Sequence, residues 1–142
     1  MKLQFFHCDV CGKDIAVLSD SHTPTVCCGK PMRELTPGKT DAAVEKHVPV
    51  FTVSGDTVSV RVGSVPHPME DGHFIAWIGI QTEHGFAFRE LHPGDSPEAV
   101  FVLAPDDRLE TVFALCNLHG MWCSDNDDGV IKRFFAKITF RD

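Results

Sequence analysis

The stretch VFTVSGDTVSVRVG, residues 50–63, decides the fold class of this chain. Two runs rich in valine and threonine flank Ser54, Gly55 and Asp56, a pattern typical of a β-hairpin. Short apolar segments recur downstream between turn sequences, and we expect each to form a strand: HFIAWIGIQT (73–82), GFAFREL (85–91), AVFVLA (99–104), LETVFALC (109–116) and VIKRFFAKITF (130–140). About seven short strands with frequent turns predict an all-β chain whose larger part is a β-sandwich.

Composition and charge narrow the class of protein. The chain has 142 residues, of which 43% are hydrophobic and 23% charged, as in a soluble globular protein. A net charge of -7, from 13 basic and 20 acidic residues, argues against a nucleic-acid partner, because binding phosphates needs a surplus of cations. The apolar run at 74–80 is too short to span a bilayer, and the first residues lack the features of a signal peptide. We therefore expect a cytoplasmic protein without membrane association.

Four of the six cysteines crowd the beginning of the chain. CDVC at 8–11 is followed, after fifteen residues, by the pair Cys27 and Cys28. Cytoplasmic thiols stay reduced by default, so this spacing indicates metal or redox chemistry before it indicates a disulfide framework. Cys8, Cys11, Cys27 and Cys28 supply four soft ligands, the number that a tetrahedral iron or zinc site requires. A segment this short, with few large aliphatic residues, needs such a metal to hold it together.

The breakers Pro37 and Gly38 in TPGKTDAA, 36–43, mark a linker. We predict a small metal module at 1–37 and a sandwich domain at 38–142. A disulfide between the neighbours Cys27 and Cys28 would be strained, and a thioredoxin-like redox pair needs a βαβ context that this sequence lacks. Adjacent cysteines cannot easily repeat the turn of CDVC, so the second half of the site should be distorted from ideal tetrahedral angles. The spacing leaves zinc and iron both open.

A second set of metal-binding residues lies downstream. EKHVPV (45–50) contains His47, VPHPMEDGHF (65–74) contains His67 and His73, and CNLHGMW (116–122) contains Cys116 and His119. A single histidine is more often a surface or hydrogen-bonded core residue than a ligand. Together, however, with prolines and a glycine that make their loops rigid, these residues predict one shared site. Four imidazole nitrogens and a thiolate favour iron or copper over structural zinc, which rarely takes five ligands.

These motifs resemble the desulfoferrodoxin family, the two-iron form of superoxide reductase, over about residues 4–123. The resemblance rests on CDVCG, VCCGKPM, EKHVPV, VGSVPHPMEDGHFIAWI, HPGDSPEAVF and CNLHGMW, all in the family's order. It implies a desulforedoxin-like module with an iron or zinc ion on four cysteines, followed by an immunoglobulin-like β-sandwich that carries a catalytic iron.

The same resemblance implies a role for each residue of the second site. His47, His67, His73 and His119 would be equatorial ligands of the iron, and Cys116 would be the axial ligand. The iron would pass one electron to superoxide, which leaves as hydrogen peroxide after taking up two protons. Lys46, a local cation on an acidic chain, would attract the anion and stabilise the reduced product. Glu45 would be the sixth ligand of the oxidised iron.

The resemblance also implies partners for the chain, and the chain departs from the family pattern after Trp122. The resemblance implies a homodimer, in the cytoplasm of an anaerobe or microaerophile, that detoxifies superoxide with electrons from a rubredoxin-like carrier. The alternatives are superoxide dismutation at the same iron, and a non-catalytic iron protein that carries electrons. The chain continues beyond Trp122, where the family tends to stop; we expect an added C-terminal strand there and a spare thiol at Cys123.

Overall fold

The structure is a computed structural model that describes residues 3–39 and 47–127. All the regular elements in these two ranges are β-strands, so the predicted all-β fold is confirmed. The chain divides into two compact units, Met1–Thr36 and Pro37–Asp142.

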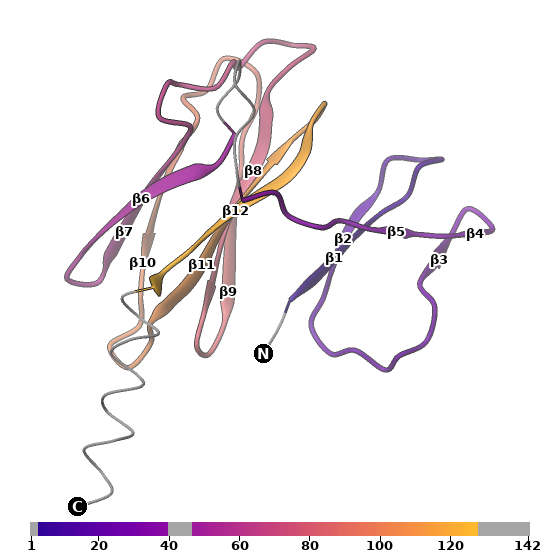
Figure 1. Ribbon diagram of the computed structural model, residues 1–142, viewed down its shortest axis with the longest axis horizontal. Coiled ribbons are helices and arrows are strands. Elements are labelled where there is room, and N and C mark those ends of the chain that lie inside the picture. The colour runs from indigo at the N-terminus through magenta and orange to yellow at the C-terminus, as the bar shows by residue number, and fades with distance from the viewer. Residues whose placement is uncertain (1–2, 40–46, 128–142) are drawn as a thin grey trace, which may run out of the picture. The chain divides into compact units, whose positions relative to one another are not determined.

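The first unit is built from five very short strands (Figure 1). β1 is the middle strand of a three-stranded antiparallel sheet, and β3 and β4 form a separate small hairpin. The strands are β1 (Gln4–His7), β2 (Asp14–Val17), β3 (Val26–Cys27), β4 (Lys30–Pro31) and β5 (Arg33–Glu34). Sequence patterning predicts none of them, because two to four residues are too few to show an alternating pattern.

Few apolar side chains stabilise this first unit. Leu3, Phe5, Met32 and Leu35 are its large buried hydrophobic residues. Complete burial of one such side chain contributes about 1.5–3 kcal/mol, which has to offset the conformational entropy of some thirty ordered residues at about 1–2 kcal/mol each. The unit therefore needs a further cross-link, and its clustered cysteines can supply one through a metal.

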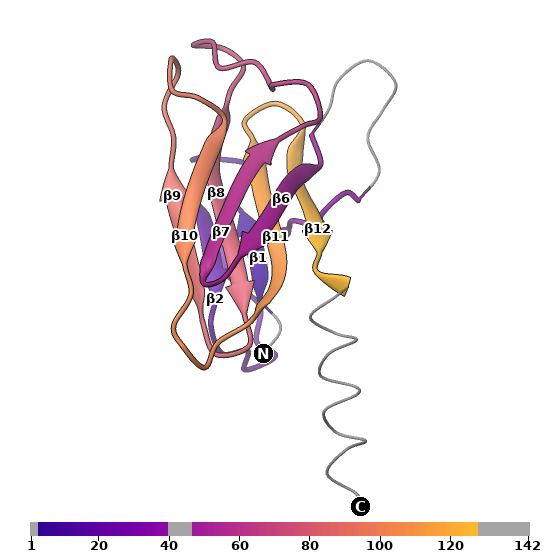
Figure 2. The same cartoon turned by 90° about the vertical axis from the view of Figure 1, so that its left-hand side faces the viewer.

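The second unit is a sandwich of two antiparallel sheets (Figure 2). One sheet has the order β10-β7-β6 and the other the order β12-β11-β8-β9. The strands are β6 (Pro49–Ser54), β7 (Thr57–Val62), β8 (Ile75–Thr82), β9 (Phe86–Glu90), β10 (Glu98–Val102), β11 (Leu109–Cys116) and β12 (Gly120–Asp125). The predicted hairpin at 50–63 is β6 and β7, with Gly55 in its turn at a φ of 61°.

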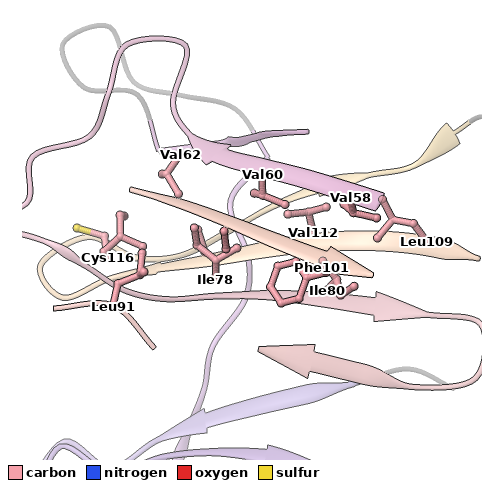
Figure 3. Close-up of a cluster of buried hydrophobic side chains, with 13 residues drawn as sticks. Val58, Val60, Val62, Ile78, Ile80, Leu91, Phe101, Leu109, Val112 and Cys116 are labelled. Atoms are coloured by element: carbon pink, nitrogen blue, oxygen red, sulfur yellow. The ribbon is translucent and has the colours of Figure 1, made fainter. Parts of the chain in front are cut away.

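The core lies between the two sheets. Val58, Val60 and Val62 of β7 alternate with polar residues and point inward, while β8 and β11 contribute larger apolar side chains from the opposite sheet. In Figure 3, Leu109 lies at one end of this core and Cys116 at the other. The core thus extends along β11 up to the strand's last residue, Cys116, which is a predicted ligand.

The predicted strands at 73–82, 85–91, 99–104 and 109–116 are confirmed as β8, β9, β10 and β11. Sequence patterning does not predict β12, because its residues GMWCSD lack the usual alternation of apolar and polar side chains. The expected strand at 130–140 lies outside the described residues. Within the described ranges, no helix has the length and apolarity needed to cross a membrane.

Candidate metal centres

Four cysteines meet in the first unit. The sulfur atoms of Cys8, Cys11, Cys27 and Cys28 all lie within 4.8 Å of one another. Cys8 follows β1, and a tight turn, in which the Gly12 N–H donates to the Cys8 carbonyl at 2.9 Å, brings Cys11 back to it. Cys27 and Cys28 come from the hairpin of β3 and β4. All four are free thiols, with 3.9 Å between the sulfurs of Cys27 and Cys28, so the disulfide alternative is excluded.

The two cysteine pairs reach the site with different backbone conformations. Cys28 has a φ of 53°, in the left-handed region that residues other than glycine rarely adopt, and Gly29 follows at 73°. The left-handed turn is what lets neighbouring side chains, which would otherwise diverge, aim their sulfurs at one point. The adjacent pair thus reaches the cluster through a backbone turn of its own, and the predicted distortion from tetrahedral angles stays a prediction.

The thiols of this cluster differ in acidity. Backbone N–H groups of Cys11 and Val10 donate to the Cys8 sulfur and lower its pKa to about 6. Hydrogen bonds shared with the sulfurs of Cys11 and Cys27 raise the pKa of Cys28 to about 12. Without a cation, one thiolate thus forms easily at the expense of its neighbours. Four thiolates at this separation require a metal ion, and four soft sulfur donors suit iron or zinc.

The second site is assembled from four segments of the sandwich. His47 precedes β6, His67 and His73 lie in the connection between β7 and β8, Cys116 ends β11, and His119 lies in the turn before β12. All are at one end of the sandwich, because each segment is an end of a strand or a connection. The structure therefore brings together the five residues that the sequence analysis singles out as ligands.

The four imidazoles form a closed ring. Neighbouring ring centroids are 4.9 Å apart for His47 and His67, 4.8 Å for His67 and His73, 5.2 Å for His73 and His119, and 4.9 Å for His119 and His47. Adjacent planes are inclined by 58° to 83°. Rings that face a common centre in this way present nitrogens to that centre from four sides, as an equatorial ligand set does.

The donor atoms themselves are close enough to share one ion. Donor atoms of His47, His67, His73 and Cys116 lie within 4.8 Å of one another. His119 Nδ1 is 3.1 Å from His47 Nε2 and 3.7 Å from Cys116 Sγ. Two nitrogens at right angles around an ion, each about 2.1 Å from it, would be about 3.0 Å apart. The separation of His47 and His119 therefore fits neighbouring positions on one metal.

Burial and neighbouring groups prepare these side chains as ligands. His47 and His67 are 3% and 4% exposed, and Cys116 is 1% exposed. The His67 Nδ1–H donates to the Pro68 carbonyl at 2.8 Å, which leaves Nε2 as the nitrogen with a lone pair. A buried thiolate would be costly on its own, so Cys116 would act as a thiolate ligand only with a cation beside it.

Asn117 is a residue of the site that the sequence analysis missed. Its amide donates to the Gly72 carbonyl at 3.1 Å, and its side-chain oxygen accepts from the Phe74 N–H at 2.8 Å. The Asn117 N–H also donates to the Phe74 carbonyl at 3.1 Å. These bonds connect the loop of Cys116 and His119 to both neighbours of His73. The only sequence signal was the position of Asn117 inside CNLHG.

Three further residues that the sequence singles out are not in the two metal clusters of the described residues: Glu45, Lys46 and Cys123. Glu45 and Lys46 lie outside the described residues. Cys123 belongs to neither metal cluster of residues 3–39 and 47–127. It is buried on β12, where desolvation raises the pKa of its thiol. The interpretation of Cys123 as a thiol separate from both sites agrees with this position.

Comparison with known proteins identifies the family. The family profile described as "Desulfoferrodoxin" matches residues 39–125, and "Desulfoferrodoxin, N-terminal domain" matches residues 1–35. A desulfoferrodoxin of Syntrophotalea carbinolica is 47% identical over 125 residues, which cover 87% of this chain and 97% of the relative. A superoxide reductase of Thermococcus kodakarensis is 37% identical over 97 residues, 55% of this chain and 83% of the relative.

Solved structures agree with the sequence relatives. The crystal structure of the superoxide reductase from Treponema pallidum superposes with a TM-score of 0.77 at 34% identity, covering 87% of this chain and 98% of that one. Both family profiles match, and the match to the Syntrophotalea carbinolica relative extends over nearly its whole length. The two clusters of metal-binding side chains agree with this family. The chain belongs to the desulfoferrodoxin family.

Proposed function

We propose that this protein is a superoxide reductase, which converts superoxide to hydrogen peroxide by one electron and two protons. The observation that carries the proposal is the closed ring of four imidazoles beside the buried thiol of Cys116. Iron is the cofactor that this donor set and the family support, and when bound it supplies the electron. His47, His67, His73, His119 and Cys116 are proposed as its ligands.

The proposed ligands determine the charge and electron density at the site. Four neutral imidazoles leave the positive charge of a metal uncompensated, whereas the Cys116 thiolate neutralises part of it and donates electron density. Axial ligand identity is one of the means by which a protein adjusts the reactivity of iron. An iron ion held by these five protein donors would still be able to bind a small anion such as superoxide.

A chain of net charge -7 repels an anion at long range, so attraction has to be local. Lys46, next to His47 in the sequence, is proposed to supply that local positive charge and to help deliver a proton. Glu45 is proposed to occupy the sixth position of the oxidised iron, since a hard oxygen donor suits a ferric ion. Both assignments rest on the family resemblance.

The remaining expectations belong to the same proposal. The four-cysteine module, proposed to end at residue 37, would hold iron or zinc, and with iron it could relay single electrons. We propose a homodimer that works in the cytoplasm and receives electrons from a rubredoxin-like carrier. The proximity of four sulfurs supports the metal, and family membership supports the rest.

Stoichiometry tests the proposed reaction. The fully reduced protein is mixed with superoxide under anaerobic conditions, and peroxide and oxygen are measured. Reduction predicts peroxide and oxidised second-site iron without oxygen release. Release of oxygen, with peroxide, at an iron that returns to its starting state would establish dismutation instead. Slow oxidation of the second site would favour a simple electron carrier.

A further inference from the structure

We propose that Trp122 is a positioning residue that holds the His47 imidazole in its metal-binding orientation. The inference rests on the proposed metal site and assigns a function to a residue outside the ligand set. The indole of Trp122 stacks on the imidazole of His47, with ring centroids 4.7 Å apart and planes inclined by only 14°. Stacking restricts rotation of the imidazole about its bond to Cβ, because rotation would separate the two faces.

The backbone beside Trp122 also restrains the position of the indole. Gly38 lies beside Trp122 in a parallel bridge: its N–H donates to the Met121 carbonyl, and its carbonyl accepts from the Cys123 N–H, both at 2.9 Å. A Cβ added at Gly38 would lie 2.8 Å from both Cε3 and Cζ3 of Trp122. The indole therefore has no room for a side chain at residue 38, and one placed there would push the indole away from its present position.

The edge of the same indole contacts a second proposed ligand. Trp122 Nε1–H donates to the His119 carbonyl at 3.2 Å. Two residues along the strand, the Ser124 hydroxyl donates to the Pro49 carbonyl at 2.6 Å, close to His47 in the chain. β12 thus holds the backbone after His47 and the turn of His119, and Trp122 connects the two ligands whose nitrogens are 3.1 Å apart.

His47 needs such support because of its place in the chain. It lies two residues before β6 begins at Pro49, whereas Cys116 is the last residue of β11 and is paired there with Ile75 and Gly120. Groups that orient metal ligands commonly contribute about tenfold or more to metal affinity. Loss of the indole should therefore weaken metal binding at the second site, and distort it, without removing a donor atom.

The test is Co²⁺ binding to the full chain after the four-cysteine site has been filled with Zn²⁺. We expect Trp122→Leu to bind Co²⁺ about tenfold more weakly than the original protein. The oxidised iron form should also show a shifted thiolate-to-iron absorption band. Trp122→Phe, which keeps a stacking ring, should restore most of the affinity and the position of the band. A merely space-filling role would not distinguish leucine from phenylalanine in the spectrum.

Two further variants control the experiment. Phe88→Leu removes an aromatic ring from the stacked pair of Phe86 and Phe88 on β9, whose planes are also inclined by 14°, and it should leave Co²⁺ binding unchanged. Gly38→Ala leaves β12 intact and should weaken binding as Trp122→Leu does, which keeps the test decisive if the leucine variant does not fold.

Original affinity and an unshifted band in folded Trp122→Leu or Gly38→Ala would overturn the inference. Absence of Co²⁺ binding by the original protein would overturn the proposed metal site instead, so the two failures are distinguishable.

Discussion

Cys116 shows how one residue can belong to the core and to the metal site at once. It packs at one end of the apolar cluster of the sandwich, while its sulfur is 3.7 Å from His119 Nδ1 (Figure 3). An apolar environment disfavours a free thiolate, so the thiolate form of Cys116 would need a metal ion to balance its charge. The environment also keeps water away from the sulfur, which strengthens its interaction with a bound ion.

Replacement of Cys116 by serine should abolish the thiolate-to-iron absorption of the oxidised second site. An oxygen donor does not produce the charge-transfer band of a sulfur donor at the same energy. The measurement is the visible spectrum of the iron-loaded, oxidised protein. Cys123→Ser is the matched control, since Cys123 is equally buried but belongs to neither cluster of the described residues; it should retain the band. A Cys116→Ser protein with an unchanged band would contradict the axial assignment.

Lys46→Ala should slow the reaction with superoxide while leaving iron bound, because a local cation raises the concentration of an anionic substrate. The difference from the original protein should shrink as salt screens the charge. Rapid mixing of each protein with superoxide at several ionic strengths measures this difference in rate. Arg89→Ala, which removes an exposed positive charge from β9, is the control and should have little effect. Equal rates for Lys46→Ala and the original protein at low ionic strength would refute steering.

At the scale of elements, hydrogen bonds within the connections between strands stabilise the ends of the sandwich. The turn before β11 depends on Asp107, whose carboxylate accepts from the Thr82 hydroxyl at 2.6 Å and from the N–H groups of Arg108 at 2.9 Å and His84 at 3.1 Å. Burial alone would raise the pKa of Asp107, but these hydrogen bonds outweigh it, and the net shift is downward. The turn is therefore stabilised by the ionised carboxylate.

Asp107→Ala should lower the free energy of unfolding at neutral pH by about 1–3 kcal/mol, since three donors lose their acceptor. A carboxyl whose pKa is lowered by folding stabilises the protein above its unfolded pKa, near 3.9, and this contribution disappears as the pH falls through the folded pKa. The difference in unfolding free energy between the variant and the original protein should therefore be constant around neutral pH and become smaller in acid.

Denaturant titrations of the two proteins across this acidic range measure the difference in unfolding free energy. Asp106→Ala, a change at the exposed neighbouring position, serves as the control and should not reproduce the loss. If the difference in unfolding free energy between Asp107→Ala and the original protein persisted unchanged to strongly acidic pH, the charge of the carboxylate would not be responsible for the stabilisation.

At the scale of the whole molecule, the two metal clusters belong to different units. The four cysteines all lie in Met1–Thr36, and the four histidines with Cys116 all lie in Pro37–Asp142. The first unit has a small apolar core and depends on its metal, whereas the sandwich has a continuous core of its own. Each site should therefore be separable from the other.

Cys11→Ser should remove the metal absorption of the four-cysteine site and leave the second iron intact and reactive. Cys11 belongs to the first unit and to the four-cysteine cluster, so its loss takes no donor from the second cluster. Iron analysis, the visible spectrum and the rate of oxidation by superoxide together measure both sites. Loss of second-site iron in this variant would show that the sites depend on each other.

Local patterns explain which elements were predictable. The alternation of valine with polar residues in β7, and the apolar runs of β8 and β11, identify strands because their periods are properties of neighbouring residues. β12 was not predicted because two of its residues are needed for tertiary contacts: Trp122 stacks on His47, and Ser124 donates a hydrogen bond to the Pro49 carbonyl. Those requirements displace the alternating pattern on which strand prediction depends.

The sequence by itself determined the all-β class, the cysteine cluster and the identity of the five proposed iron ligands, because ligand chemistry and strand periodicity are written in residue types and short spacings. Only the tertiary structure decided how the ligands are held. Asn117 connects two ligand loops, and the indole of Trp122 stacks on His47 and leaves no room for a side chain at Gly38. These contacts join residues far apart in the chain, so they exist only once the two sheets have packed and brought their ends together.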